Sequence, residues 1–148
     1  MSLYGRPSDY AHRLPNQPAI DRFANAVWAV AVGGSRPSIR LSPRKATRKF
    51  GTWRVRMHEG KPLESILLNG PHGLQAATIL HELAHSMHFR QCGSLAEWRR
   101  QDHHGHQWLA CLRELEVAAD LVWEEEAKRA LAGLSRVVTA LAADRTGR

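Results

Sequence analysis

The spacing of apolar residues switches along this sequence from helical to strand-like and back, and this order limits the possible folds. Residues 20–32 place apolar side chains at helical spacing, between Pro18 and Gly33-Gly34. Residues 52–57 alternate apolar and polar side chains, and residues 38–41 and 65–69 are further short candidate strands. Helical spacing then returns and continues to residue 143. A helix, a small sheet containing antiparallel strands, and several helices predict an α+β fold.

The second half of the chain is expected to be helical in four or five pieces. The first covers Leu74–Arg90, where Leu80, Leu83, Ala84 and Met87 form a core-facing stripe. A short turn of helix at 95–100 and a helix at 105–117 follow, and residues 120–143 continue as one helix or a pair. The length of 148 residues suits a single domain, with an irregular N-terminus over 1–17 and a frayed tail over 144–148.

Composition points to an intracellular chain. No run of 18 apolar residues occurs, so neither a transmembrane helix nor a membrane partner is expected. The polar residues 1–9 lack the apolar centre of a secretory signal. Two cysteines, Cys92 and Cys111, are too few for a disulfide scaffold and are expected to be free, partly buried thiols. We therefore expect a cytoplasmic protein.

The net charge of +7 is concentrated in one stretch, between Arg36 and Arg56. No acidic residue interrupts this stretch, which contains eight basic residues: Arg36, Arg40, Arg44, Lys45, Arg48, Lys49, Arg54 and Arg56. Such a patch favours phosphate backbones through Coulomb attraction and counterion release. Charge alone is unspecific, so a solvated basic face is the more ordinary explanation. Nucleic acid is therefore one possible partner.

Six of the nine histidines lie between His81 and His106. His81 and His85 are four residues apart on an expected helix, so both imidazoles project from one face and can bind one Zn²⁺. Glu82, next to the first histidine, can hold a metal-bound water and take its proton. Zinc lowers the pKa of that water toward about 7. The pattern is that of the HExxH metallopeptidases, whereas the alternative is a helix with two histidines and no metal.

A catalytic zinc ion requires a third protein ligand. The long metzincin pattern fails, because His88 and Gln91 stand where it needs glycine and histidine. Carboxylates of a later helix are possible, and the candidates are Glu114, Glu116 and Asp120. The run 102–108 offers a better candidate, His104, with His106 and His103 behind it. His104 precedes Gly105 where the chain can turn into a helix, and Trp108 would anchor that helix in the core.

Several neighbouring residues are assigned supporting roles. His88 lies about 10.5 Å along the helix from His81, too far to share one zinc ion, and is expected to support the site or line its cleft. Asp102 could hold a ligand imidazole or cap a helix. His58 and His72 are expected at the surface or in turns. Tyr4 and Tyr10 are far upstream, so the oxyanion donor stays open among His103, His106, an arginine and the metal.

The two motifs, His81-Glu82-x-x-His85 and His104-Gly105-x-x-Trp108, resemble those of the SprT-like (Spartan-like) zinc metallopeptidases and of small bacterial metallohydrolases of the same minimal zincin type. The resemblance covers roughly residues 65–115. It implies that His81, His85 and His104 bind zinc and that Glu82 is the general base. It also implies that a strand near residues 66–68 is the edge along which an extended peptide substrate pairs. SprT-like proteins are associated with nucleic acid.

The chain differs from that family in two respects. Trp108 stands where phenylalanine is usual, and two cysteines are too few for the zinc ribbon that many members add. The leading hypothesis is accordingly a zinc-dependent peptidase that hydrolyses intracellular proteins. The alternatives are a zinc-containing binding or regulatory module without catalysis, and a nucleic-acid-binding protein that uses the Arg36–Arg56 stretch.

Overall fold

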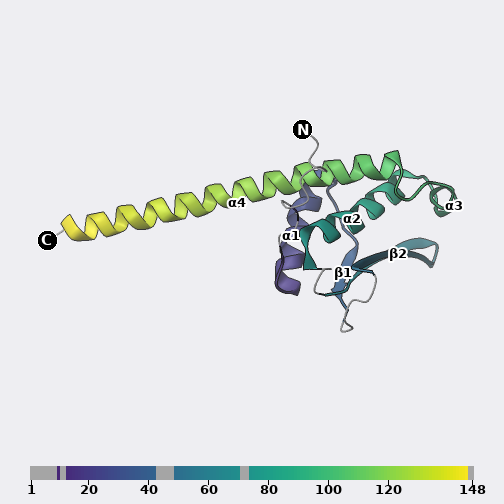
Figure 1. Cartoon of the computed structure of the whole chain (residues 1–148), viewed down its shortest axis with the longest axis horizontal. Helices are drawn as coiled ribbons and strands as arrows, with labels where there is room; N and C mark the ends of the chain where they lie inside the picture. The colour runs from purple at the N-terminus through teal and green to yellow at the C-terminus, as the bar shows by residue number, and fades with distance from the viewer. Residues whose placement is uncertain (1–9, 11–12, 43–48, 71–73, 147–148) are drawn as a thin grey trace. The chain divides into compact units, whose positions relative to one another are not determined.

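The computed structural model describes residues 10, 13–42, 49–70 and 74–146, which form four helices and three strands (Figure 1). The chain divides into two compact units, residues 1–118 and 119–148. The mixture of helices with a small sheet confirms the predicted α+β class. The prediction of a single domain stays a prediction. Within the described residues, the search for a helix long and apolar enough to span a membrane finds none.

The sheet of the first unit has three strands in the order β1-β3-β2. β2 (Gly51–His58) and β3 (Lys61–Leu68) pair antiparallel, and β1 (Ser38–Leu41) pairs parallel with β3. Glu59 and Gly60, with φ of 49° and 76°, connect β2 to β3. Two positive φ angles in a two-residue connection match the twist of a hairpin. The strands were predicted from their periodicity, whereas the parallel pairing was not.

The resemblance led us to expect an edge strand near residues 66–68, and this expectation is wrong. Ile66 pairs with Ile39 on one side and with Trp53 on the other, so β3 is the central strand. A central strand has both rows of backbone groups engaged and cannot accept a further chain. β1 and β2 are the outer strands of this sheet.

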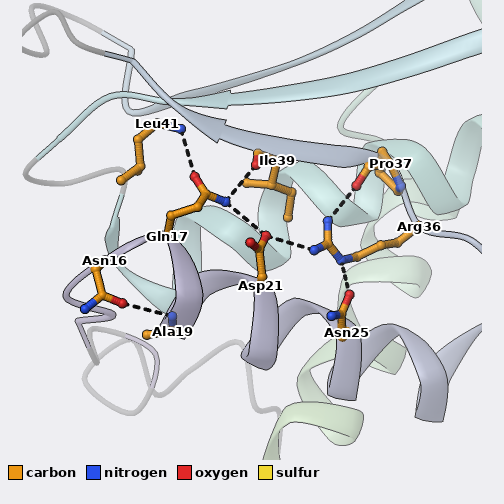
Figure 2. A network of polar contacts seen from close by, with 9 residues as sticks. All are labelled: Asn16, Gln17, Ala19, Asp21, Asn25, Arg36, Pro37, Ile39 and Leu41. Atoms are coloured by element: carbon orange, nitrogen blue, oxygen red, sulfur yellow. Dashed lines mark hydrogen bonds and ion pairs between the residues drawn. The ribbon is translucent and has the colours of Figure 1, made fainter.

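Helix α1 (Gln17–Ala31) begins at a side-chain cap and covers the outer side of β1. The Asn16 side chain accepts a hydrogen bond from Ala19 N, and Pro18 lies in the first turn, both favourable at a helix start. The Gln17 amide donates to Ile39 O at 2.9 Å and accepts from Leu41 N at 3.3 Å (Figure 2). Gln17 thus satisfies two outward backbone groups of β1, as a neighbouring strand would.

Helix α2 (Ala76–Gln91) contacts β2 and β3 and contributes much of the core. The predicted stripe is confirmed, since its four members are buried: Leu80, Leu83, Ala84 and Met87. Glu64 of β3 anchors the helix, because its carboxylate accepts hydrogen bonds from Ser86 Oγ and, at 2.8 Å, from Arg90 Nε. α2 is therefore fixed in register against the sheet by a buried polar contact as well as by apolar packing.

The remaining helices are α3 (Leu95–Arg99) and α4 (His106–Thr146). α3 begins at the Ser94 side chain, which accepts from Glu97 N. α4 is one continuous helix, so the break expected between residues 117 and 120 is absent. No glycine or proline occurs there to stop it. Cys92 and Cys111 are buried free thiols, as predicted.

Candidate metal centre

Two of the candidate ligands, His81 and His85, lie one turn apart in the middle of α2. Their Nε2 atoms are 3.3 Å apart, and their ring centroids are separated by 4.9 Å. The helix itself produces this approach, since side chains four residues apart share a face. The predicted pair of converging imidazoles is therefore present.

The third candidate, His104, is placed by a turn that precedes α4. The Asp102 carboxylate accepts a hydrogen bond from His104 N at 3.1 Å, and Asp102 O accepts from Gly105 N at 3.1 Å. A Cβ added to Gly105 would lie 3.0 Å from Asp102 Cβ. Glycine thus allows the tight turn that aims His104 at α2. Asp102 therefore acts on the backbone of His104, as a cap would, rather than on its imidazole.

His104 completes a three-histidine group with His81 and His85. His104 Nε2 lies 3.3 Å from His81 Nε2, and one ligand atom from each residue lies within 4.8 Å of the others. Zinc–nitrogen bonds of roughly 2.0–2.1 Å in a tetrahedron place neighbouring nitrogens about 3.3–3.4 Å apart. Two of the three pairs already have this separation. The three histidines can hold a metal ion, and their nitrogen donors suit zinc among several divalent metals.

Aromatic rings hold the three imidazoles from two sides. The Trp108 ring lies 4.8 Å from that of His81, 5.6 Å from that of His85 and 4.9 Å from that of His104. Trp53 stacks on His85 from β2 at 6.2 Å, and its indole nitrogen donates to Glu64 at 3.0 Å. His85 Nδ1 is buried and has no hydrogen-bond partner among the described residues. Packing between two tryptophans, rather than the usual hydrogen bond to the second nitrogen, fixes this ring.

Burial favours the uncharged form of two of the ligand imidazoles, His81 and His85. Desolvation, assisted by repulsion from His104, lowers the pKa of His81 to about 4. Desolvation lowers the pKa of His85 to about 3, and the neighbouring histidines His81 and His104 lower it further. Only the neutral imidazole offers a lone pair to a metal, so both rings are ready to bind one at neutral pH.

Glu82 lies beside the three-histidine group, where β2 begins. Its side chain is buried, and a Cβ added to Gly51 would lie 3.0 Å from Glu82 Cγ. Desolvation raises the pKa of Glu82 to about 7, against the opposing effects of a hydrogen bond with the Trp53 backbone and of attraction by Lys49. A carboxyl group with this pKa can both accept and release a proton near neutrality. Gly51 provides the space that the Glu82 side chain occupies.

Two hollows adjoin the three-histidine group. A groove of about 370 Å³ is lined by the start of β2, by Glu82, by all three ligand histidines, and by Trp98 and His103. A larger hollow of about 590 Å³ meets His81 and His104, and its other lining residues are mainly apolar: Tyr10, Ala77, Leu80, Trp108, Leu112 and Glu116. Tyr10 is buried beside the site although it is far away in the sequence. Only the tertiary fold brings it there, so spacing gave no signal for it.

The other predicted residues occupy separate positions. His103 stacks on Trp98 at 3.9 Å, and its Nε2 lies 3.2 Å from Trp98 O, which turns it away from the ligand group. His106 is exposed at the start of α4. His88 is fully buried, and its Nε2 lies 3.2 Å from Gln107 Oε1. None of the remaining candidates belongs to the group of possible ligands found within the described residues: His103, His106, His88, Glu114, Glu116 and Asp120.

Part of the basic stretch has a structural role. Arg36 donates to Asn25 Oδ1 at 2.6 Å, to Pro37 O at 2.8 Å and to Asp21 at 3.0 Å (Figure 2). Arg40, Arg54 and Arg56 are exposed, and strand alternation puts them on the sheet face opposite buried Ile39 and Trp53. Arg44, Lys45 and Arg48 lie outside the described residues, as do His72 and Tyr4.

Comparison of the chain with protein-family models, with curated protein sequences and with solved structures finds no match.

Proposed function

We propose that this chain is a zinc-dependent peptidase with Glu82 as its general base. One observation carries the proposal: three imidazoles converge on one point, beside a buried carboxyl group, at a groove that runs past an outer strand. A structural zinc site is usually closed by four protein ligands, whereas a catalytic site has three and an open position. The described residues supply three, which favours catalysis over the alternative of a non-catalytic zinc module.

In this mechanism His81, His85 and His104 would hold the metal. A bound zinc ion would polarise the scissile carbonyl and acidify water, as Lewis acids do. The Glu82 carboxylate would accept a proton from the attacking water and pass it to the leaving amine. Burial of Glu82 beside Gly51 fixes the carboxylate for both transfers.

The outer edge of β2 would hold the peptide substrate. β2 pairs with β3 on one side only, and Gly51, Thr52 and Trp53 line the groove beside Glu82. An extended peptide can add to such an edge through main-chain hydrogen bonds. The edge of β1, by contrast, is occupied by Gln17. This assignment replaces the edge at residues 66–68 that the family resemblance implied.

Tyr10 is our candidate donor for the oxyanion, because it lines the hollow that also touches His81 and His104. A phenol can donate a hydrogen bond to a developing negative charge. Tyr10→Phe should lower kcat roughly 10–100-fold with zinc content unchanged, since loss of one such donor has effects of this order or larger. An unchanged kcat would transfer the role to His103, which lines the groove on the other side.

The deciding experiment measures zinc content and casein or peptide-library cleavage on four purified proteins. Wild type should bind about one zinc ion per chain, as a three-ligand site requires, and should cleave peptide bonds. His104→Ala should lose the metal and the activity. Glu82→Gln should retain the metal and lose the activity. The control is His106→Ala, an exposed histidine two residues from His104, which should behave as wild type.

Cleavage that persists in Glu82→Gln would refute the peptidase mechanism. Zinc binding without any cleavage by wild type, over a broad peptide library, would favour the alternative of a non-catalytic zinc module. Wild type that takes up no zinc would overturn both.

A further inference from the structure

The second unit of the chain carries an apolar stripe that faces solvent. Leu131, Leu134, Val138 and Leu141 of α4 are between 58% and 67% exposed. Their spacing of three, four and three residues places them on one side of the helix, in the pattern of coiled-coil core positions. Four large apolar side chains on one exposed stripe form a surface that a soluble partner would cover. We call these four residues the α4 seam.

The part of α4 that carries the seam lies beyond Val122, and none of the residues described there is buried. Two exposed ion pairs join Lys128 to Glu124 at 3.4 Å and to Glu125 at 3.6 Å. Such pairs contribute only tenths of a kcal/mol. Most helix stability in proteins comes from packing of an apolar face, and helices that lack such packing are marginal in water. A partner on the α4 seam would supply that packing.

Charges at the two ends of the α4 seam identify the partner. Leu131 and Val138 are seven residues apart and occupy the same core position in successive heptads. Glu124, seven residues before Leu131, and Arg145, seven residues after Val138, occupy that position too. These two charged residues are 21 residues or about 32 Å apart along the helix. Two parallel copies would place Glu124 against Glu124 and Arg145 against Arg145. Two antiparallel copies would place Arg145 of one within about a turn of Glu124 of the other. The surface is therefore complementary to itself in the antiparallel orientation.

A membrane surface fits this helix less well. Residues 124–146 contain no Trp, Tyr or Phe, which membrane-surface helices use on the apolar side. The run Glu124–Glu126 would also repel anionic lipids.

We propose that the α4 seam pairs two copies of this chain as a short antiparallel coiled coil. Leu131 would face Leu141 of the partner subunit, and Leu134 would face Val138 of the partner subunit, around a two-fold axis near residue 136. The overlap is short compared with a standard interface, so the dimer should be weak and concentration-dependent. This inference is independent of the proposed peptidase activity.

Sedimentation equilibrium of the full chain over a wide concentration range tests the proposal. Wild type should pass from 16.6 kDa toward twice that mass as concentration rises. Leu134→Asp with Val138→Asp should remain monomeric throughout. The matched control is Ala132→Asp with Ala140→Asp, which adds the same charges on the opposite side of the helix and should dimerise as wild type. Circular dichroism and zinc content check that each variant is folded.

Charge exchange tests the orientation without disturbing the apolar stripe. Glu124→Arg alone and Arg145→Glu alone should each raise the dissociation constant roughly two- to tenfold, the range expected for exposed ion pairs. The double exchange should restore it. In a parallel dimer, the single exchanges would leave like charges facing each other and would change little.

Three results would overturn the proposal. Wild type that stays monomeric at every concentration would show that the seam is covered within one chain or not at all. A dimer that survives Leu134→Asp with Val138→Asp would place the interface elsewhere. A monomer that binds phosphatidylserine vesicles through the seam would assign it to a membrane surface.

Discussion

At the scale of single residues, the site depends on the orientation of three imidazoles, which is set by helix geometry, by a backbone turn and by side-chain packing. His81 and His85 could be predicted from their spacing on a helix, because helix geometry alone sets their approach. His104 was predicted from its place before Gly105 and Trp108, and the structure brings it to 3.3 Å from His81. The approach of Tyr10 could not be predicted, because it depends on contacts that spacing does not encode. Of the two roles considered for Asp102, the structure shows the cap-like hydrogen bond to the backbone of His104.

Gly105 should be needed for metal affinity although it cannot bind a metal. In Gly105→Ala the new methyl group would lie 3.0 Å from Asp102 Cβ, so Asp102 must shift by a few tenths of an ångström and the turn that carries His104 should be disturbed. Loss of such support typically weakens metal binding 10–100-fold, and we expect a loss of roughly this size by competition with a zinc chelator. The matched control is Gly93→Ala, whose added methyl meets nothing within 4 Å. Equal affinities in the two variants would contradict this account of the turn.

Glu82 should destabilise the metal-free protein above neutral pH. Its pKa is raised from 4.5 to about 7 by burial, so the folded state binds more protons than the unfolded state between these values. Stability therefore falls as pH rises from 4.5 to 7, by at most about 3.5 kcal/mol, since each pKa unit corresponds to about 1.4 kcal/mol. Glu82→Gln removes the penalty.

Thermal melts in EDTA check this sign. The Tm advantage of Glu82→Gln over wild type should be small near pH 4.5, should grow through pH 6 and should level off above pH 7. His81 and His85 are present in both proteins, so their own titration cancels in the difference. Glu114→Gln, at an exposed position of α4, is the control and should show no such trend. An advantage that shrinks as pH rises would refute the burial argument.

At the scale of helices and strands, periodicity predicted each element but not how the elements meet. Every expected strand is present, and the helix expected over 74–90 spans 76–91. The parallel pairing of β1 with β3 joins Ile39 to Ile66 across 27 residues of sequence. Such pairing depends on how whole elements pack, and the periodicity of single residues does not predict it. The continuation of α4 through residues 117–120 reflects the absence of a helix-breaking residue rather than any positive signal.

The approach of β2 to α2 should control catalysis separately from metal binding. In Gly51→Ala the added methyl would lie 3.0 Å from both Glu82 Cγ and Thr78 Cγ2, so these two side chains must shift by a few tenths of an ångström. If the chain is a peptidase, kcat/KM should fall roughly 10–100-fold, the effect of a small misplacement of a catalytic group. Zinc content should stay unchanged, because the three atoms nearest to the added methyl belong to Glu82 and Thr78 rather than to a ligand histidine.

Parallel assays of kcat/KM and of zinc content test this separation. Gly70→Ala is the matched control, since its added methyl would meet only Leu74 Cδ1 at 4.0 Å. Activity that survives in Gly51→Ala would show that the position of Glu82 tolerates the movement. Loss of zinc together with activity would show that the substitution disturbs the whole site.

At the scale of the whole molecule, the net charge of +7 is the property that a partner molecule could most readily recognise. The structure divides the basic stretch into Arg36, which is engaged within the first unit, and three arginines on the outer sheet face: Arg40, Arg54 and Arg56. If that face binds a polyanion, affinity for duplex DNA should fall steeply with salt. Composition predicted the charge, but only the strand alternation identifies which arginines are available.

The logarithm of the DNA association constant should fall less steeply with the logarithm of salt concentration when Arg40, Arg54 and Arg56 are replaced with alanine. The magnitude of this slope should decrease by up to about three, near one for each phosphate that is no longer neutralised. Fluorescence anisotropy with a labelled DNA duplex measures this slope. The control replaces Arg99, Arg100 and Arg113, which are exposed elsewhere, and removes the same charge. Equal slopes in both triple variants would assign the binding to net charge alone, and no binding at low salt would remove nucleic acid as a partner.

The Gln17 side chain that covers β1 has a consequence for how this sheet could propagate. A sheet with two open edges can recruit copy after copy into a fibril, because each added strand exposes a new edge. Here the amide of Gln17 terminates one side, so growth could proceed only from β2. Two molecules joined through β2 would leave no open edge and would stop at a pair. If molecules of this chain add to one another through β2, the two hydrogen bonds of Gln17 to β1 would favour a closed pair over a fibril.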